Sequence, residues 1–483
     1  MRIQTQLLLS GLLLIPALKV QAFCGFYVAK AGSALYNEKS EVIMVRDGLR
    51  NVITMSNDFK GSAKDFAMVI PVPVVLKESD IRVIERGLFG RWDAYSAPRL
   101  VEYFDHNPCY ENLVEVTSNI RKERTSKAPV TADAQEDESF GVKIEARYSI
   151  GEYDIMVLSA EQSGGLKDWL IQNGYAVPPS AEEVLMPYIR SGMKFFVVKV
   201  NLKQLQQTGF NYLRPIQIKF ESERFMLPIR LGMANSQGEQ DLIVYAITRS
   251  GSVECSNYRT VDLPTGNKIP TFIKQDFGSF YKDLFAKEHR RQGSNAVFTE
   301  YAWNVSPNWG GMKCDPCVGL PPNYADLIES GADWLQTDPR AFFTRLHVRY
   351  GREKFPQDLF FTQTANTQNR QARYAITWPA QGPMECSEAK QYLESLPGRR
   401  SLELQELAML TGWNTDAYQG YIKDGKAPKA NNGKEGSFPI LYAPDRGDNG
   451  KGGGWRWLLA MSVLALGLLF AGMRKQQVQA SAT

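Results

Sequence analysis

Histidine is scarce in this chain, whose 483 residues include only His106, His289 and His347. None of the three lies in a His-x-x-x-His or cysteine–histidine spacing of the kind that holds zinc. The Gly-x-x-x-x-Gly-Lys-Ser/Thr phosphate loop, the dinucleotide-binding glycine fingerprint and the Gly-x-Ser-x-Gly nucleophile turn are absent as well. The sequence therefore predicts no metal ion and no cofactor, and it offers no standard nucleophile.

Positive and negative residues are nearly balanced in number. The 56 Lys and Arg residues stand against 52 Asp and Glu residues, which leaves a formal net charge of +4. A general nucleic-acid-binding protein needs a dense basic surface, so we expect no nucleic-acid partner. A content of 43% hydrophobic and 22% charged residues is typical of a globular protein with a sizeable core.

Residues 1–22 have the pattern of a secretion signal. Arg2 supplies the positive charge, an apolar run covers 7–18, and Val20-Gln21-Ala22 offers a small-residue cleavage site. The apolar run is shorter than the roughly 20 residues that a membrane-spanning helix needs. We therefore expect signal peptidase to remove this segment and the mature chain to begin at Phe23.

The other end of the chain has the pattern of a membrane anchor. Residues 455–473 are almost wholly apolar, with two tryptophans at their start, and they are followed by Arg474 and Lys475. This pattern predicts a transmembrane helix with a cytoplasmic tail at 474–483. The protein is therefore expected in the cytoplasmic membrane as a single-pass protein, with its ectodomain on the extracytoplasmic, periplasmic or cell-surface, side.

The segment 414–454 is rich in Gly, Lys and Asn and is interpreted as a tether to the membrane. Together with the span and the basic pair that follows it, this stretch also resembles the Gly-Gly type of bacterial carboxy-terminal sorting signal. That resemblance implies an alternative fate, in which a rhomboid-type sorting protease cuts near the membrane and releases the ectodomain.

Between the two ends, the patterns predict an α+β ectodomain with mixed, largely antiparallel sheets and interspersed helices. A weak boundary divides it into an N-terminal region, 23–295, and a C-terminal region, 296–413. Asp47-Gly48 between two β-rich runs predicts a hairpin. Helical patterns cover 163–175, 272–291 and 388–413, and strand-like runs occupy much of 142–160 and 194–248.

Cysteines are few but even in number, at positions 24, 109, 255, 314, 317 and 386. In an oxidising compartment three disulfides are the default, and six cysteines allow 15 pairings. A bond between Cys314 and Cys317 would stabilise the fold by roughly 2 kcal/mol, and a bond from either to Cys386 by roughly 4.4 kcal/mol. The chain-entropy model thus favours long-range disulfides, and a local disulfide between Cys314 and Cys317 is the alternative.

The motif Cys314-Asp-Pro-Cys317 is similar to the Cys-Gly-Pro-Cys of thioredoxin-like enzymes. In those enzymes the first cysteine follows a strand and begins a helix, whose dipole stabilises the thiolate. Here the nearest strand-like run ends around Trp303, and Pro321-Pro322 disfavours a helix that starts at the motif. We interpret the pair as a covalent brace, with a thiol-disulfide oxidoreductase as the alternative.

A carboxylate-based hydrolase is a further alternative. Glu239 and Asp241 alternate along a strand-like run, so both side chains point to one side, where two carboxylates can couple. A turn that leads into a strand explains the same residues more simply. His347 is interpreted as an ordinary strand residue.

Several characteristic runs are spread over residues 23–365. The runs are FCGFYVAKA (23–31), FAMVIPVPVVL (66–76), RLVEYFDHNPC (99–109), EYDIMVLSAEQSGGLKDWLIQNGY (152–175), SGMKFFVVKV (191–200), LPIRLGMANSQGEQDLIVYAIT (227–248), FTEYAWNV (298–305), CDPC (314–317) and FTRLHVRYG (343–351). Together they resemble a bacterial family of exported envelope proteins, domain of unknown function 2330. The resemblance implies export and no established activity, and it transfers no catalytic residue.

The sequence thus favours a membrane-tethered, non-enzymatic module whose disulfide-braced ectodomain binds an envelope protein or polymer.

Overall fold

The computed structural model describes residues 26–29, 36–37, 40–56, 59–60, 66–110, 138–139, 141–173, 177, 181–201, 203–205, 213–234, 238–317 and 319–425. The predicted signal (1–22), Cys24, the predicted span (455–473) and the tail (474–483) lie outside the described residues. Within the described ranges, no helix combines the length and the apolarity needed to cross a bilayer.

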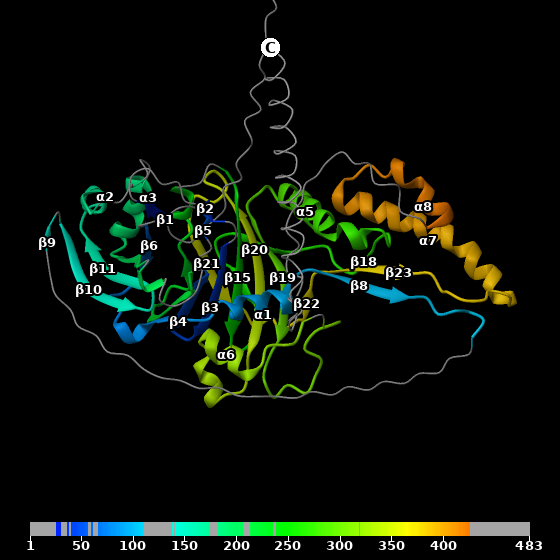
Figure 1. Ribbon diagram of the computed structural model, residues 1–483, viewed down its shortest axis with the longest axis horizontal. Coiled ribbons are helices and arrows are strands. Elements are labelled where there is room, and N and C mark those ends of the chain that lie inside the picture. The colour runs from blue at the N-terminus through cyan, green and yellow to red at the C-terminus, as the bar shows by residue number, and fades with distance from the viewer. Residues whose placement is uncertain are drawn as a thin grey trace, which may run out of the picture. The chain divides into compact units, whose positions relative to one another are not determined.

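One antiparallel sheet has six strands, in the order β1-β6-β12-β11-β10-β9 (Figure 1). Helices α2 (Ser163–Gln172) and α3 (Ala181–Arg190) bury Leu166, Trp169 and Tyr188 against this sheet. The strands are β1 (Phe26–Ala29), β6 (Phe66–Val72), β12 (Lys194–Val200), β11 (Tyr153–Ala160), β10 (Val142–Ile150) and β9 (Glu138–Ser139).

The second sheet has nine strands, in the order β17-β19-β20-β15-β3-β4-β13-β7, with β22 also paired to β19. Its neighbours are antiparallel except β15 with β3 and β17 with β19. The strands are β17 (Arg259–Asp262), β19 (Ala296–Asn304), β20 (Phe342–Tyr350), β15 (Gln240–Thr248), β3 (Ser40–Asp47), β4 (Arg50–Ser56), β13 (Ile216–Glu221), β7 (Ile81–Val83) and β22 (Arg370–Gln371).

Strand alternation decides what each face of the nine-stranded sheet contacts. Along β15, Leu242 and Val244 enter a core shared with the six-stranded sheet, while Ile243 and Tyr245 point to the opposite side. That opposite side packs against α1 (Gly87–Ser96) and α6 (Tyr324–Ser330). Near β19 it also meets α5 (Ile273–Arg291). The chain is thus a layered α+β structure in which two sheets face each other and helices cover both outer sides.

Three smaller sheets complete the fold (Figure 1). The parallel pairing of β8 with β23 joins segments far apart in the sequence, and α7 (Ser387–Thr411) packs over them together with α5. The small sheets are β18 (Asn267–Lys268), β23 (Arg373–Trp378) and β8 (Arg99–Phe104); β14 (Met226–Leu227), β21 (Leu359–Gln363) and β16 (Val253–Cys255); and β2 (Tyr36–Asn37) with β5 (Phe59–Lys60). Short 3-10 turns are η1 (Glu78–Asp80), η2 (Gly232–Ala234), η3 (Asp333–Gln336) and η4 (Asp416–Tyr418).

The mixed, largely antiparallel α+β class predicted from the sequence is confirmed. The predicted hairpin at Asp47-Gly48 joins β3 and β4, where Gly48 adopts a positive φ of 59°. The regions 23–295 and 296–413 share one sheet, because β19 and β20 add to β15 and β3, so this division does not separate two sheets.

The start of the predicted tether is folded. Residues 414–425 include η4 and α8 (Gln419–Asp424), and Tyr421 is buried against Phe272, with ring centroids 5.2 Å apart. Two tyrosines in a segment rich in Gly, Lys and Asn supply enough apolar surface to hold it on α5 and α7. The remainder of 414–454, from 426 on, lies outside the described residues.

Four of the five cysteines that the structure describes form two disulfides, Cys109–Cys386 and Cys314–Cys317. The bond from the Cys314-x-x-Cys317 motif to Cys386 that the chain-entropy model favours does not form, because Cys386 pairs with Cys109, and the local disulfide that was the alternative is the one observed. The parallel β8–β23 pair carries both chain segments to the same end of their sheet, which places these two cysteines together. Cys255 is buried and unbonded, and burial raises the pKa of its thiol.

Removing the two disulfides should cost different amounts of stability. In the chain-entropy model, a bond across the 277-residue separation of Cys109 and Cys386 constrains the unfolded chain by about 5–6 kcal/mol, against about 2 kcal/mol for Cys314–Cys317. Chemical unfolding of the Cys109→Ala/Cys386→Ala and Cys314→Ala/Cys317→Ala variants should therefore show the larger loss in the first. Equal losses would contradict the assignment of the main covalent brace to Cys109–Cys386.

Candidate functional site

A β-bulge in β19 sets the arrangement of polar groups on the helix-covered face of the nine-stranded sheet. The register between β19 and β20 shifts between Thr299 and Tyr301, so that Glu300 is the extra residue. Because of this shift, Glu300 and Tyr301 both point to the face that carries Arg345, where regular alternation would have separated them. The bulge thus delivers a carboxylate into the core.

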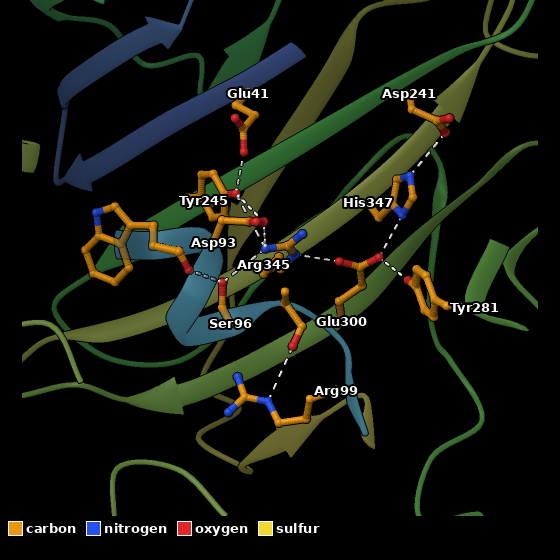
Figure 2. Close-up of polar contacts among 12 residues, drawn as sticks. Glu41, Asp93, Ser96, Arg99, Asp241, Tyr245, Tyr281, Glu300, Arg345 and His347 are labelled. Atoms are coloured by element: carbon orange, nitrogen blue, oxygen red, sulfur yellow. Dashed lines mark hydrogen bonds and ion pairs between the residues drawn. The ribbon is translucent and has the colours of Figure 1, made fainter. Parts of the chain in front are cut away.

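Arg345 is the centre of a buried ionic network (Figure 2). Its side chain is 3% exposed, and its guanidinium lies 2.7 Å from Asp93 Oδ1 and 2.5 Å from Glu300 Oε2. Asp93 comes from α1 and Glu300 from β19, so the guanidinium joins a helix to two strands. The two carboxylates compensate the free-energy cost of removing the guanidinium from water. Burying the same arginine without a partner would strongly destabilise the fold.

The network extends to both sides of Arg345 (Figure 2). On one side, Tyr245 donates its hydroxyl hydrogen bond to Glu41, with 2.7 Å between the oxygens. On the other side, the His347 ring lies between Glu300, 2.7 Å from Nδ1, and Asp241, 3.1 Å from Nε2. Tyr281 of α5 also donates to Glu300. The network therefore runs across four strands, β3, β15, β20 and β19, between α1 and α5.

Charge coupling inside the network shifts the pKa values of its members. Burial alone raises the pKa of the Glu300 carboxyl, but the charges of Arg345 and His347 outweigh it and bring the pKa to about 2. Burial lowers the pKa of His347, whereas Glu300 and Asp241 raise it, and the net direction is upward. Both directions favour a charged imidazolium held between two carboxylates.

Glu239 and Asp241, the carboxylates of the hydrolase hypothesis, lie beside different basic residues. Asp241 accepts hydrogen bonds from Arg349, with its Oδ1 2.8 Å from Nε, and from His347. Glu239 lies 3.7 Å from Nε2 of His289, and burial lowers the pKa of that histidine to about 4. His347, expected to be an ordinary strand residue, proves to be a member of the ionic network. Within the described ranges, no cluster of His, Cys, Asp and Glu has the make-up of a metal site.

The Cys314–Cys317 bond closes a tight loop without a helix. Cys314 is buried and Cys317 is exposed, and the next helix, α6, begins only at Tyr324. The loop is fixed to the sheet through its backbone, since Tyr301 donates to the carbonyl oxygen of Lys313 over 3.1 Å. No helix dipole therefore acts on either sulfur, in contrast to the thioredoxin-like arrangement.

A cavity of about 470 Å³ lies beside this loop, at the outer edge of β19, and is called the edge cavity below. There β19 changes partner from β17 to β22, next to the bulge. The hydroxyl of Thr299 is buried and has no hydrogen-bond partner among the described residues. The lining residues are Asp262, Leu263, Thr265, Gly266, Thr299, Trp303, Asp315, Gln368, Asn369, Arg370, Gln371, Ala372 and Arg373.

The charges of the edge cavity are paired. Arg370 lies 3.3 Å from Asp262, and Arg373 lies 3.0 Å from Asp315. Two cations and two anions leave no net charge among the lining side chains, although each retains hydrogen-bonding capacity. The cavity is thus polar and electrically balanced.

A second cavity of about 260 Å³ lies between the two facing sheets and is called the inter-sheet cavity below. Its walls are mostly apolar. The lining residues are Ile53, Met55, Ile70, Pro71, Val72, Pro73, Ser191, Met193, Ile218, Phe220, Ser222, Glu223, Arg224, Met226, Leu227 and Pro228. Neither of these two cavities is lined by a member of the ionic network, which ties α1 and α5 to the strands of the sheet.

Sequence reasoning placed its candidates at Cys314, Cys317, Glu239 and Asp241, and missed Glu300 and Arg345. Both missed residues lie within largely apolar, strand-like runs. A charged residue in such a run indicates a buried ion pair, and this signal could have identified them. The edge cavity carries no local sequence signal, because its walls come from four separate segments.

Neutralising Glu300 should destabilise the protein and change its acid stability. Glu300→Gln leaves Arg345 partly uncompensated, which should cost about 3–5 kcal/mol of unfolding free energy, whereas Glu102→Gln in the exposed pair with Lys274 should cost under about 1 kcal/mol. Since the folded pKa of Glu300 is about 2, below its ordinary 4.5, its contribution is present above pH 4.5 and is lost as the pH falls toward 2.

Urea unfolding at a series of pH values measures both effects. The wild-type protein should lose this part of its stability between about pH 4.5 and 2, and the Glu300→Gln variant should lack that part of the decline. Parallel pH profiles for the two proteins would show that Glu300 is not the coupled group.

Comparison with known proteins gives one informative result. Neither the curated proteins nor the solved structures contain a significant match to the chain. A family model, described as an uncharacterized protein conserved in bacteria, matches residues 18–362, well over half of the chain. The protein therefore belongs to this bacterial family, DUF2330.

Proposed function

We propose that this protein is exported, anchored in the cytoplasmic membrane by residues 455–473, and acts outside the cytoplasm as a non-enzymatic binding module. The proposal of export and anchoring rests on the signal-like pattern of 1–22 and on the apolar run that precedes Arg474 and Lys475. The proposal of binding rests on the edge cavity.

The buried, unpartnered hydroxyl of Thr299 is the observation that carries the binding proposal. A buried polar atom without a partner is unfavourable, and a ligand that supplies the missing hydrogen bond removes that cost. Gln368 and Asn369 line the same cavity and offer further donors and acceptors, and the Trp303 ring offers an apolar surface.

The balanced charges of the cavity favour a neutral, hydroxyl-rich ligand. Arg370 and Arg373 are each engaged by an aspartate, so an anion or a cation would have to displace an existing ion pair. A saccharide unit of an envelope polymer has the required chemistry, because its hydroxyls both donate and accept. The thiol-disulfide alternative has less support, since Cys314 is buried and no helix begins at the motif.

Binding can be tested with soluble, uncharged oligosaccharides of N-acetylglucosamine by titration calorimetry. The Thr299→Val variant keeps the side-chain shape but removes the hydroxyl, so it should weaken binding by about 2–12-fold, the value of one neutral hydrogen bond. Thr362→Val, at an exposed position on β21 outside the cavity, is the matched control and should bind like the wild-type protein. Absence of binding by the wild-type protein, or equal affinities of both variants, would refute the assignment.

Export and anchoring have a separate test in a bacterial host. The full chain should sediment with membranes, begin at Phe23, and be digested by protease added to spheroplasts. Deletion of residues 455–483 should release a soluble protein into the extracytoplasmic fraction. An ectodomain that protease reaches only after lysis of the cells would contradict the proposed topology.

A further inference from the structure

The inter-sheet cavity is apolar inside and open at a polar mouth. Its interior walls come from both sheets, with Ile53 and Ile218 on one side and Ile70 and Val72 on the other. Three flexible methionines, Met55, Met193 and Met226, also line it. Protein interiors are normally packed to crystal-like density, so an apolar void of about 260 Å³ is unusual.

The size and chemistry of the walls define what can enter. An engineered apolar cavity of about 150 Å³ stays dry and binds benzene, and this cavity is larger. Methionine side chains adapt to irregular apolar ligands because they are unbranched and polarisable. A hydrocarbon chain therefore fits the interior better than a polar group or a rigid planar one.

The mouth of the cavity carries positive charge. Arg224 lines it and has no ion-pair partner among the described residues. Just behind the mouth, Arg46 donates to the carbonyl oxygens of Ser222 (2.8 Å) and Glu223 (3.2 Å), both of which are neutral acceptors. Two guanidinium groups and one carboxylate, that of Glu223, thus lie near the mouth, and the excess positive charge favours an anionic head group.

We propose that the inter-sheet cavity binds a medium-chain fatty acid, with the hydrocarbon chain between the sheets and the carboxylate at Arg224. The site is separate from the edge cavity and shares no lining residue with it. Its occupation does not depend on saccharide binding.

A chain-length series tests the hydrocarbon part of the proposal. Sodium hexanoate, octanoate, decanoate and dodecanoate are titrated into the full-length protein below their critical micelle concentrations. Affinity should rise about fourfold per added methylene and then level off when the cavity is full. Binding that is absent, or that does not change with chain length, would overturn the proposal.

Two variants that each remove one positive charge test whether the fatty-acid carboxylate binds at Arg224. Arg224→Ala should weaken decanoate binding by about tenfold and leave decanol binding unchanged. Lys219→Ala removes an exposed cation from the neighbouring β13 outside the mouth and should leave both affinities unchanged. Equal losses in the two variants would overturn the role of the mouth.

A third set of variants tests the location of the chain. Val72→Phe should fill the cavity and abolish decanoate binding, and Ser191→Trp should block the mouth from an exposed position if the first variant does not fold. Full decanoate affinity in a folded Val72→Phe or Ser191→Trp protein would place the chain elsewhere. Thr299→Val should retain decanoate affinity, so the proposed function and this inference can fail separately.

Discussion

The pairing of Arg345 with Asp93 and Glu300 is the constraint on which the helix-covered side of the nine-stranded sheet depends. Burying a guanidinium that is 3% exposed is costly unless carboxylates surround it, and here they come from α1 and from the bulge of β19. The contact with Asp93 fixes the position of α1 on the sheet. The contact with Glu300 fixes the inward orientation of the side chain that the bulge provides. Tyr245 and His347 extend the same tie toward β3 and α5.

The bulge that satisfies Arg345 also shapes the outer edge of β19. The strand pairs with β17 before the bulge and with β22 after it, and the edge cavity lies at this change of partner. β-bulges are common at sheet edges and beside active sites, where they redirect a side chain or end the pairing of two strands. The charged groups of the ionic network are paired with one another, whereas the edge cavity contains a hydroxyl without a hydrogen-bond partner in the described part of the chain. The network therefore holds elements together, and the cavity retains capacity to bind a ligand.

The two disulfides act at different scales. Cys109–Cys386 ties the start of α7 to the end of the β8 segment, across most of the folded chain. Cys314–Cys317 shapes one loop that forms part of the edge cavity wall through Asp315. A motif that resembles a redox centre in the sequence is therefore, in its surroundings, a local brace beside a cavity.

The sequence by itself determined the types of the elements, because the signals for these are local. The helical pattern of 272–291 predicted α5, and Asp47-Gly48 predicted the hairpin. Only the tertiary structure decided the pairing of Cys109 with Cys386, the joining of both predicted regions in one sheet and the lining of the cavities. These features depend on contacts between residues separated by tens to hundreds of positions, which neither periodicity nor turn chemistry encodes.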